Sequence, residues 1–327
     1  MECKILKKKI DPFMSFGKMP MANGFLNKED FNNEFFYELK VGFSEDVSLL
    51  QLNDHPSPKQ MFNKKYPFYT GSSEFMKSHF KKYANWINKY LKNFTHLIEI
   101  GSNDGTFLNN FRNSNLNLIG FEPSENVALK AKNNGINTIN DFFCLNSIDE
   151  IKKFHNNTDI ICAANVICHI PDLNDLIRTI DKLLKTKGLF VFEEPYLGAM
   201  FEKTSYDQIY DEHVYIFSLT SMQNICSKFG LELFDVEHID TSGGSLRYFI
   251  AKKGVYKKTK NYNFFLNYEK KFNLLNNKIY VDFNKSCKKS KEELLKLLKS
   301  LTNKNKKICG YSATSKSTTI YNYCGIN

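Results

Sequence analysis

The sequence predicts an α/β protein whose largest domain is built on a parallel, doubly wound sheet. Short runs of apolar residues alternate with segments of helical periodicity between residues 96 and 195. Strands that are apolar throughout are typical of parallel sheets, because helices cover both faces of such a sheet. A hydrophobic content of 42% and a charged content of 24% are ordinary for a globular chain, so 327 residues suffice for a substantial core.

The N-terminal part of the chain shows little regular pattern. Residues 1–75 are rich in Pro, Asn and aromatic residues without a sustained period, which predicts a small irregular domain. In residues 76–92, the apolar positions Phe80, Tyr83 and Ile87 follow the spacing of an amphipathic helix. We therefore expect the largest domain to begin near residue 76.

Five apolar runs are expected to form strands of the sheet. They read HLIEI, LNLIGF, NTI, DIICAAN and GLFVFEEP, at residues 96–100, 116–121, 137–139, 159–165 and 188–195. Helical segments at residues 124–135 and 173–188 separate them, and the second is expected to stop at Gly188, a residue that favours a helix C-terminus. Two further strands, LELFDVEHI and SLRYFIAKKG, complete this domain near residue 252.

The C-terminal region, residues 253–327, begins with a lysine-rich, largely helical connector. A strand–turn–helix start, KKICGYSATSKSTTIYNYCGIN, follows, and there the chain stops. A lone strand and a helix cannot bury themselves as a sheet domain. We expect either a truncated C-terminal domain or a tail that docks on the main domain.

Composition and charge predict where the protein is located and which kinds of partner it binds. No apolar run approaches roughly eighteen residues, the N-terminus lacks an apolar signal core, and the eight cysteines show no paired spacing. These features predict a cytoplasmic protein without a membrane partner, a monomer or weak homo-oligomer. The net charge of +10 comes from diffuse lysines, and its densest patches, KKGVYKKTK and NKNKKICGY, match no nucleic-acid-binding motif. We expect no nucleic-acid partner and interpret the basic surface as suited to a phosphorylated small substrate.

A turn with two glycines follows the first predicted strand of the sheet. Gly101 and Gly105 permit a tight turn and a close approach of a ligand to the backbone. Asn103 stands where a dinucleotide-binding GxGxxG motif needs its second glycine, so NAD is disfavoured. Glu99 before this turn and Glu122 after the next strand instead suit S-adenosylmethionine, whose two ribose hydroxyls a carboxylate can accept. The alternative is a plain α/β turn with a structural glutamate.

The segment SYDQIYDEHVYIFSL, residues 205–219, gathers a phenol, two carboxylates and an imidazole at Tyr210, Asp211, Glu212 and His213. A solvated turn and an acid–base centre are both consistent with this composition.

Several motifs in order and spacing resemble those of the nucleotide-sugar C-methyltransferases, which act on 4-keto-deoxyhexoses attached to a nucleoside diphosphate. They are EIGSNDGTFL, FEPS, ANVICHIPDL, QIYDEHVYIFSL and TSGGSLRYF, with GKMPMANGFL and YPFYTGSSEFMKSHF upstream and ICGYSATSKSTTIYNYCGI at the end. The resemblance covers nearly the whole chain. It implies a class I methyltransferase domain with a Rossmann-like sheet that binds S-adenosylmethionine. A small zinc-bearing domain would precede it, and a Rossmann-like domain that helps to enclose the sugar nucleotide would follow.

The chain departs from this family in two respects. The family's N-terminal domain holds zinc with four cysteines, whereas Cys3 is the only cysteine here before Cys144, so we predict no metal. The family's C-terminal domain also continues beyond the position of Gly325, where this chain ends after two more residues. A non-catalytic family member therefore remains an alternative.

The implied reaction assigns roles to the segment at 210–213. C-methylation next to a ketone needs a base for the proton and a donor for the enolate oxygen. His213 is expected to be the base because an imidazole titrates near neutral pH. Tyr210 would share a helical face with His213 and donate to the enolate or orient the ring, whereas Glu212 would fix the imidazole tautomer or contact the sugar. Asp211 is expected to face solvent. A sugar O-methyltransferase, the nearest rival, would need no enolate donor.

Further site residues follow from the resemblance or from local motifs. The resemblance places Asn165 and His169 at the methyl-transfer site, in contact with cofactor and substrate, and Asp141 and Phe142 at the adenine. Within the matching motifs, Asp104 and Pro123 are also assigned to the cofactor, and Tyr69 is expected to close over the sugar. Lys316, in the near-miss phosphate loop GYSATSKST, is expected to meet the diphosphate. Structural alternatives remain: a core histidine at 169, packing aromatics at 69 and 142, and a solvated lysine at 316.

Overall fold

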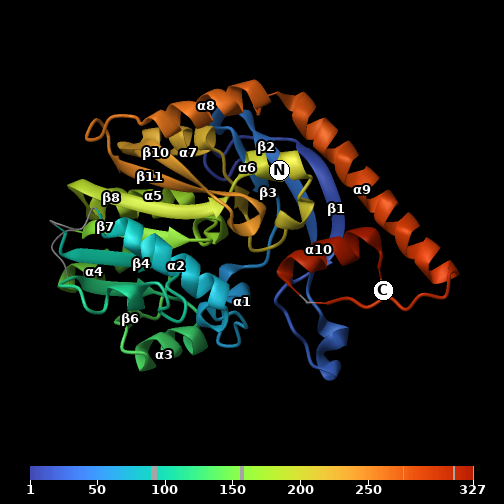
Figure 1. The fold of residues 1–327 in the computed structure, drawn as a ribbon, viewed down its shortest axis with the longest axis horizontal. Coiled ribbons are helices and arrows are strands. Elements are labelled where there is room, and N and C mark those ends of the chain that lie inside the picture. The colour runs from blue at the N-terminus through green and yellow to red at the C-terminus, as the bar shows by residue number, and fades with distance from the viewer. Residues whose placement is uncertain (90–93, 155–157, 275, 312–313, 327) are drawn as a thin grey trace.

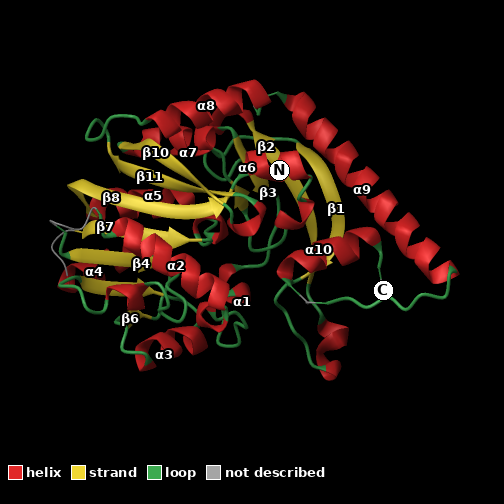
Figure 2. Ribbon diagram, viewed as in Figure 1, coloured by secondary structure: helices red, strands yellow, loops and turns green. Residues whose placement is uncertain are grey.

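The computed structural model describes residues 1–89, 94–154, 158–274, 276–311 and 314–326 (Figure 1). The chain is organised around two sheets. The larger sheet has the strand order β10-β11-β8-β7-β4-β5-β6, and the smaller one has the order β1-β2-β3-β9. Figure 2 shows the smaller sheet beside the larger one, with the long helix α9 along the outside of the molecule.

The larger sheet contains the predicted strands. They are β4 (His96–Ile100), β5 (Asn117–Phe121), β6 (Thr138–Ile139), β7 (Thr158–Ala164), β8 (Leu184–Pro195), β10 (Leu231–Ile239) and β11 (Ser245–Lys252). The pairs β4–β5, β4–β7, β5–β6 and β7–β8 are parallel, whereas β11 runs antiparallel to both β8 and β10. The sheet is therefore mostly, but not entirely, parallel. The connection between β10 and β11, at Thr241–Gly243, is too short for the crossover that a parallel pair needs.

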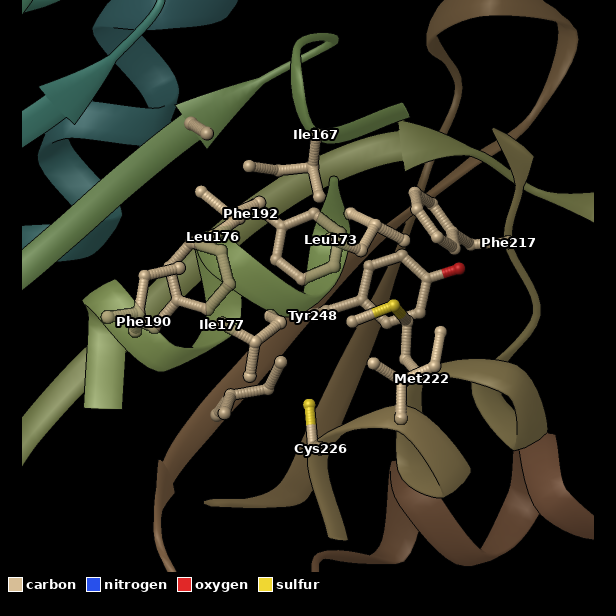
Figure 3. Packing of buried hydrophobic residues seen from close by; sticks show 14 of the residues in the cluster. Ile167, Leu173, Leu176, Ile177, Phe190, Phe192, Phe217, Met222, Cys226 and Tyr248 are labelled. Atoms are coloured by element: carbon tan, nitrogen blue, oxygen red, sulfur yellow. The ribbon is translucent and has the colours of Figure 1, made fainter. Parts of the chain in front are cut away.

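Helices cover both faces of this sheet, because alternate residues of each strand point to opposite sides. On one face, α5 (Leu173–Leu183) and α7 (Leu219–Cys226) pack against the sheet, and on the other face α2 (Glu74–Ile87) does so. Figure 3 shows the first of these interfaces. Its side chains include Leu176, Ile177, Phe190, Phe192, Met222, Cys226 and Tyr248.

The other helices of this domain are α3 (Glu125–Asn133), α4 (Ile148–Phe154) and α6 (Leu197–Lys203). The end of the helix expected at residues 76–92 falls partly on residues 90–92, which lie outside the described residues.

The prediction that the helix after residue 173 stops at Gly188 is wrong. Helix α5 ends at Leu183, and the next five residues already belong to β8, which pairs with Thr158 of β7 at Leu184. An ion pair of 2.8 Å between Lys185 Nζ and Asp159 Oδ1 supports this early start of the strand. A Cβ added at Gly188 would lie 2.9 Å from the Leu184 side chain, so this glycine allows a close approach within the strand.

The N-terminal region is more regular than expected. It contains β1 (Pro12–Pro20), β2 (Phe36–Ser44), β3 (Leu49–Leu52) and a short helix α1 (Pro58–Met61). Two register shifts in the β1–β2 pair and four consecutive buried residues in β3 hide the two-residue alternation of a strand. The fourth strand of this sheet, β9 (Tyr215–Ile216), follows directly after the 210–213 segment, so the sheet is joined to the predicted central domain.

The C-terminal region consists of α8 (Lys260–Phe272), α9 (Asn277–Asn303) and α10 (Ser315–Cys324). The strand expected at residues 306–311 does not form; these residues are exposed and have no partner strand among the described residues. Helix α10 instead packs against β1, with Thr319 and Cys324 buried, so the tail docks on the rest of the chain (Figure 1). Of the helices in the described ranges, none has the length and apolar composition of a membrane span.

Candidate active site

A cavity of about 680 Å³ opens at the carboxyl ends of the central strands. Ile100, Phe121 and Ala164, the last residues of β4, β5 and β7, all line it. Ligands bind at this edge in open α/β sheets because the loops that leave parallel strands meet there. Asn23 from the N-terminal region and Lys316 from α10 close the cavity from other sides.

Most residues predicted to bind the cofactor lie on one side of this cavity. They are Gly101, Asn103, Glu122, Pro123, Asp141, Phe142 and Asn165. Glu122 Oε1 accepts a hydrogen bond of 2.7 Å from the Ser124 N–H, and Oε2 accepts one of 3.1 Å from the Asn103 N–H. Each carboxylate oxygen keeps a second lone pair for a ligand hydroxyl. Burial raises the pKa of Glu122, and the hydrogen bonds from Ser124 and Asn103 oppose that rise.

Glu99, Asp104 and Gly105 lie behind the lining of the cavity rather than in it. Glu99 is buried, and burial followed by the nearby Asp104 and Glu122 raises its pKa well above the ordinary value. The Oε2 atom of Glu99 and the hydroxyl of Ser102 have no hydrogen-bond partner among the residues that the structure describes. Unpaired buried polar atoms are costly, so this turn is suited to a polar ligand that approaches it.

The segment at residues 68–70 lies over the cavity and is tied to the glycine turn. Asn103 accepts a 2.8 Å hydrogen bond from the Thr70 N–H and donates one of 3.1 Å to the Phe68 carbonyl. Tyr69 itself does not line the cavity, because its hydroxyl is 2.8 Å from Asn126 Nδ2. The neighbours Phe68 and Thr70 line it instead, which the sequence did not indicate.

The four residues predicted to be catalytic line the same cavity: His169, Tyr210, Glu212 and His213. The segment 210–213 is a turn and not a helix, closed by a 3.0 Å hydrogen bond from the His213 N–H to the Tyr210 carbonyl. This turn still brings the Tyr210 hydroxyl within 2.9 Å of His213 Nε2. The predicted contact between these two side chains therefore forms, although the expected helix does not.

The tautomer of His213 follows from its two partners. Nδ1 lies 2.8 Å from the backbone carbonyl of Gln208, which can only accept, so Nδ1 carries the proton. Nε2 then accepts from the Tyr210 hydroxyl. The proposal that Glu212 fixes the tautomer is wrong, because Gln208 does so.

Burial keeps both histidines of the site neutral. Burial, then the proximity of His169 and Lys316, lowers the pKa of His213 well below its ordinary value. Burial also lowers the pKa of His169 to about 3. The two rings stack with their centroids 5.4 Å apart, and Nε2 of His169 has no partner in the structure.

Asp211 does not face solvent as expected, since it is only 1% exposed. Its Oδ2 accepts a 2.8 Å hydrogen bond from the Ala22 N–H, which satisfies the buried carboxylate. Glu212 Oε1 accepts one of 2.5 Å from Asn23 Nδ2, and Tyr66 is a second partner of Glu212. Burial and the charge of Asp211 raise the pKa of Glu212 to about 7.

Asn23 and Tyr66 are site residues that the sequence analysis missed. Both lie in segments that resemble the family, GKMPMANGFL and YPFYTGSSEFMKSHF, but neither stands near the 210–213 segment in the sequence. Their proximity to Glu212 arises only in the folded chain.

Asn165 and His169 lie on the loop after β7, which a buried carboxylate holds in place. Glu194 Oε1 accepts hydrogen bonds of 2.9 Å and 3.1 Å from the N–H groups of Val166 and Cys168. Asn165 adopts a left-handed backbone conformation with φ of 54°. Burial raises the pKa of Glu194 to about 7.

Cys168, His169 and His213 form the one group of potential metal ligands found among the described residues. The Cys168 thiol is hydrogen-bonded to Glu194, and burial raises its pKa well above the ordinary value. A thiol binds a metal as the thiolate, and His213 Nε2 already accepts from Tyr210. These partners favour acid–base chemistry over metal binding at this group.

Three family models match the chain in series. They are described as a putative zinc binding domain at residues 3–62, a methyltransferase domain at residues 74–236, and a C-methyltransferase C-terminal domain at residues 240–327. The C-methyltransferase NovU of Streptomyces niveus is 26% identical over 317 residues, which are 96% of this chain and 75% of that protein.

Solved structures are also similar. An S-adenosylmethionine-dependent methyltransferase from Clostridium acetobutylicum ATCC 824 has a TM-score of 0.42 and 13% identity, covering 54% of this chain and 92% of that one. The PH0226 protein from Pyrococcus horikoshii OT3 has a TM-score of 0.45 and 16% identity, covering 58% of this chain and 97% of that one.

The residues of the segment that matches a zinc-binding model do not fit a zinc site. Cys3 is the only cysteine in residues 3–62, and its Sγ accepts a hydrogen bond of 3.5 Å from the Leu6 N–H. In this segment the structure brings together no group of three potential metal ligands, all its residues being among those described. A tetrahedral zinc ion needs four ligands, so no role for zinc follows here.

Proposed function

Since the chain belongs to the C-methyltransferases, with a class I methyltransferase fold and S-adenosylmethionine as cofactor, we propose that it methylates a carbon of a keto-sugar nucleotide. The methylated carbon is adjacent to the 4-keto group of a nucleoside-diphosphate deoxy sugar. The reaction proceeds through an enolate of that ketone.

The hydrogen bond between Tyr210 and His213 is the observation that carries this proposal. A carbon next to a ketone becomes nucleophilic only when it loses a proton while its carbonyl oxygen is stabilised. His213 is neutral, with its basic Nε2 at the cavity, and Tyr210 is a hydroxyl donor at the same point. Transfer to a sugar hydroxyl would need the base alone, so the pair favours C-methylation.

In the proposed step, His213 removes the proton from the carbon next to the ketone, and the enolate forms. The C–H electron pair becomes the carbon–carbon double bond of the enolate, and the carbonyl pair moves onto oxygen. His213 Nε2 takes the proton and becomes cationic, with Nδ1–H still bound to the Gln208 carbonyl. The Tyr210 hydroxyl, no longer accepted by Nε2, then donates to the enolate oxygen.

The cofactor, when bound, supplies an electrophilic methyl group on a sulfonium. Glu122 would accept the two ribose hydroxyls, and Asp141 and Phe142 would hold the adenine. Asn165 and His169 line the same cavity and would lie near both the cofactor and the sugar. The unpaired Oε2 of Glu99 and hydroxyl of Ser102 lie beneath the turn that the cofactor approaches.

The sugar nucleotide approaches from the side of α10. Lys316 lines the cavity one residue into this helix, so a cation and the positive end of a helix dipole face the same space. A diphosphate is the anionic group that such an arrangement favours. Burial lowers the pKa of Lys316, and the nearby Asp207 opposes this shift and so favours the charged ammonium.

Methyl transfer to defined substrates tests this function. The protein is incubated with isotopically labelled S-adenosylmethionine and 4-keto-deoxy sugars that carry different nucleoside diphosphates, and products are analysed by mass spectrometry and NMR. We expect a new methyl group that is bonded to carbon and stable to acid hydrolysis. Methylation of a hydroxyl, or no transfer to any keto-sugar nucleotide, would overturn the proposal.

A further inference from the structure

Three distant parts of the chain meet at Glu212. Asn23 donates from Nδ2 to Glu212 Oε1 over 2.5 Å, and its Oδ1 accepts from the Ser315 hydroxyl over 3.0 Å. In the sequence, Asn23 is 189 residues from Glu212 and 292 residues from Ser315. The loop before β2, the turn at 210–213 and the first residue of α10 are thus joined through one amide.

The chemistry of the amide determines the direction of this chain of hydrogen bonds. The oxygen of Asn23 carries no hydrogen, so the Ser315 hydroxyl must donate to it. The nitrogen then faces Glu212, where it can only donate, and the carboxylate is held as an acceptor. If the amide turned over, its oxygen would face an ionised carboxylate and the hydrogen bond to Glu212 would be lost, although the Ser315 hydroxyl could still accept from the amide nitrogen.

The surroundings of Glu212 make its ionisation depend strongly on the hydrogen bond from the Asn23 amide. The titratable groups that face this carboxylate are Asp211, Tyr66, Tyr210 and Cys168, and none of them is a cation. Burial and Asp211 favour the protonated form of Glu212, whereas the hydrogen bonds from Asn23 and Tyr66 favour the ionised form. Asn23 therefore supplies one of the two interactions that oppose protonation.

Helix α10 is held on the same part of the site by a second contact. The Thr319 hydroxyl donates to the carbonyl of Ile209 over 2.7 Å, directly before Tyr210. Thr319 is buried, and both Ser315 and Lys316 line the cavity. The start of α10 is therefore part of the wall that surrounds the proton-transfer residues.

We propose that Asn23 is a positioning residue for the methyl-transfer reaction, that it holds Glu212 as an ionised acceptor for a hydroxyl of the sugar, and that Ser315 of α10 holds Asn23. This inference rests on the proposed function, because it assigns Glu212 to the sugar. In this arrangement the docked helix α10 influences the ionisation of Glu212 through Ser315, in addition to contributing the cation of Lys316.

The state of Glu212 can be measured without any substrate. Protein labelled with ¹³C at the glutamate carboxyl carbons is titrated by NMR, and the spectrum of Glu212→Gln identifies the signal of Glu212. Loss of a donor disfavours the ionised form, so Asn23→Ala is expected to raise the pKa of Glu212 by about one unit. Asn23→Asp, which keeps the shape and adds a negative charge, should raise it further.

Ser315→Ala is expected to shift the same signal in the same direction by a smaller amount. Combining it with Asn23→Ala should add nothing, because both substitutions break one chain of hydrogen bonds. Ser317→Ala is the matched control: it removes the same side chain from the same helix, and among the described residues this hydroxyl donates to the Thr314 carbonyl and not to Asn23. The control should leave the Glu212 signal at its parent position.

Methyl transfer provides the second readout. If Glu212 acts as an ionised acceptor, the acidic limb of kcat/KM should move to higher pH by the same amount in Asn23→Ala and Asn23→Asp. At neutral pH the rate should fall about tenfold, the loss of one hydrogen bond to a charged group. Ser317→Ala should match the parent profile.

The two readouts separate this inference from the proposed function. A shifted Glu212 titration in a protein that methylates no keto-sugar nucleotide would support the positioning role and refute the proposed function. Methyl transfer with an unshifted titration and an unshifted acidic limb in Asn23→Ala and Asn23→Asp would overturn the positioning role. Additive effects of Asn23→Ala and Ser315→Ala would overturn the part assigned to α10.

Discussion

At His213, a backbone carbonyl decides which ring nitrogen is basic. The Gln208 carbonyl takes the Nδ1 proton, so Nε2 is left to accept from Tyr210 and, in the proposed reaction, from the substrate. Burial disfavours the charged ring and lowers its pKa. Burial therefore favours the neutral ring, and Nε2 is the atom that would take the proton in the proposed reaction.

His213→Asn is expected to abolish proton removal and to leave binding intact. An asparagine keeps a polar side chain of similar reach but has no basic nitrogen, so methyl transfer should fall by about 10²–10⁴. Exchange of the sugar's α-proton with deuterated water, followed by NMR without methyl donor, isolates this step. Exchange at the parent rate in His213→Asn would transfer the role of base to Tyr210 or His169.

Glu122→Ala tests the cofactor side of the cavity. The substitution removes both acceptors for the ribose hydroxyls and should weaken S-adenosylmethionine binding by about 1.5–3 kcal/mol, roughly tenfold or more. Calorimetry measures this directly. Glu125→Ala in the first turn of α3 is the matched control, because that carboxylate lies outside the cavity lining. Equal affinities of Glu122→Ala and the parent would remove Glu122 from the cofactor site.

Apolar packing stabilises the N-terminal sheet, as a metal ion stabilises small zinc-binding domains. Cys3, Ile5, Val47 and Leu49 are buried and belong to the same core cluster as residues of β4 and β7. Strand β9 also extends this sheet from within the larger domain. A region that packs on a large core and shares a strand with it needs no ion to fold.

The N-terminal region is therefore expected to be free of zinc. Elemental analysis should find less than stoichiometric zinc, and incubation with a strong chelator should leave the Tm unchanged, because Cys3 is the only thiolate available in residues 3–62. A Cys3→Ser variant with the parent zinc content would provide the control for metal bound elsewhere. One zinc ion per chain that Cys3→Ser removes would contradict this expectation.

For the whole molecule, three buried carboxylates make stability depend on pH. Burial raises the pKa of Asp211 to about 6 and those of Glu194 and Glu212 to about 7. Since these values lie above those of the unfolded chain, the folded protein binds more protons between pH ~4 and 7. The free energy of unfolding should consequently fall as the pH rises through this window.

Glu194→Gln should reduce this dependence. A glutamine oxygen can accept the N–H groups of Val166 and Cys168 as the carboxylate does, but it cannot ionise. We expect the decrease in unfolding free energy between pH 4.5 and 7 to shrink by up to about 3 kcal/mol, measured by urea denaturation at several pH values. A Glu194→Gln protein with the parent slope would exclude Glu194 as a source of the pH dependence.

The alternation of buried strands and helices was predictable because each element has a recognisable hydrophobic pattern within a short stretch of sequence. β4 and β10 occupy the residues predicted for them, since each is an apolar run bounded by turn residues. The glycine turn after β4 and the acidic residue after β5 were recognisable for the same reason. Local periodicity reports local burial, and burial of a strand depends mainly on its own side chains.

The tertiary structure alone decided which residues act together. The end of α5 depends on pairing between β7 and β8, and the burial of Asp211 depends on an N–H group 189 residues away. Asn23 and Tyr66 line the cavity because the N-terminal region folds over it, and the strand expected at residues 306–311 does not form because none of the described strands pairs with it. Hydrogen bonds between distant segments depend on how the whole chain packs, and no short window of sequence contains both partners. The sequence by itself therefore determined the α/β fold and the position of the glycine turn, whereas the tertiary structure decided the partners, burial and orientation of the residues proposed for acid–base chemistry.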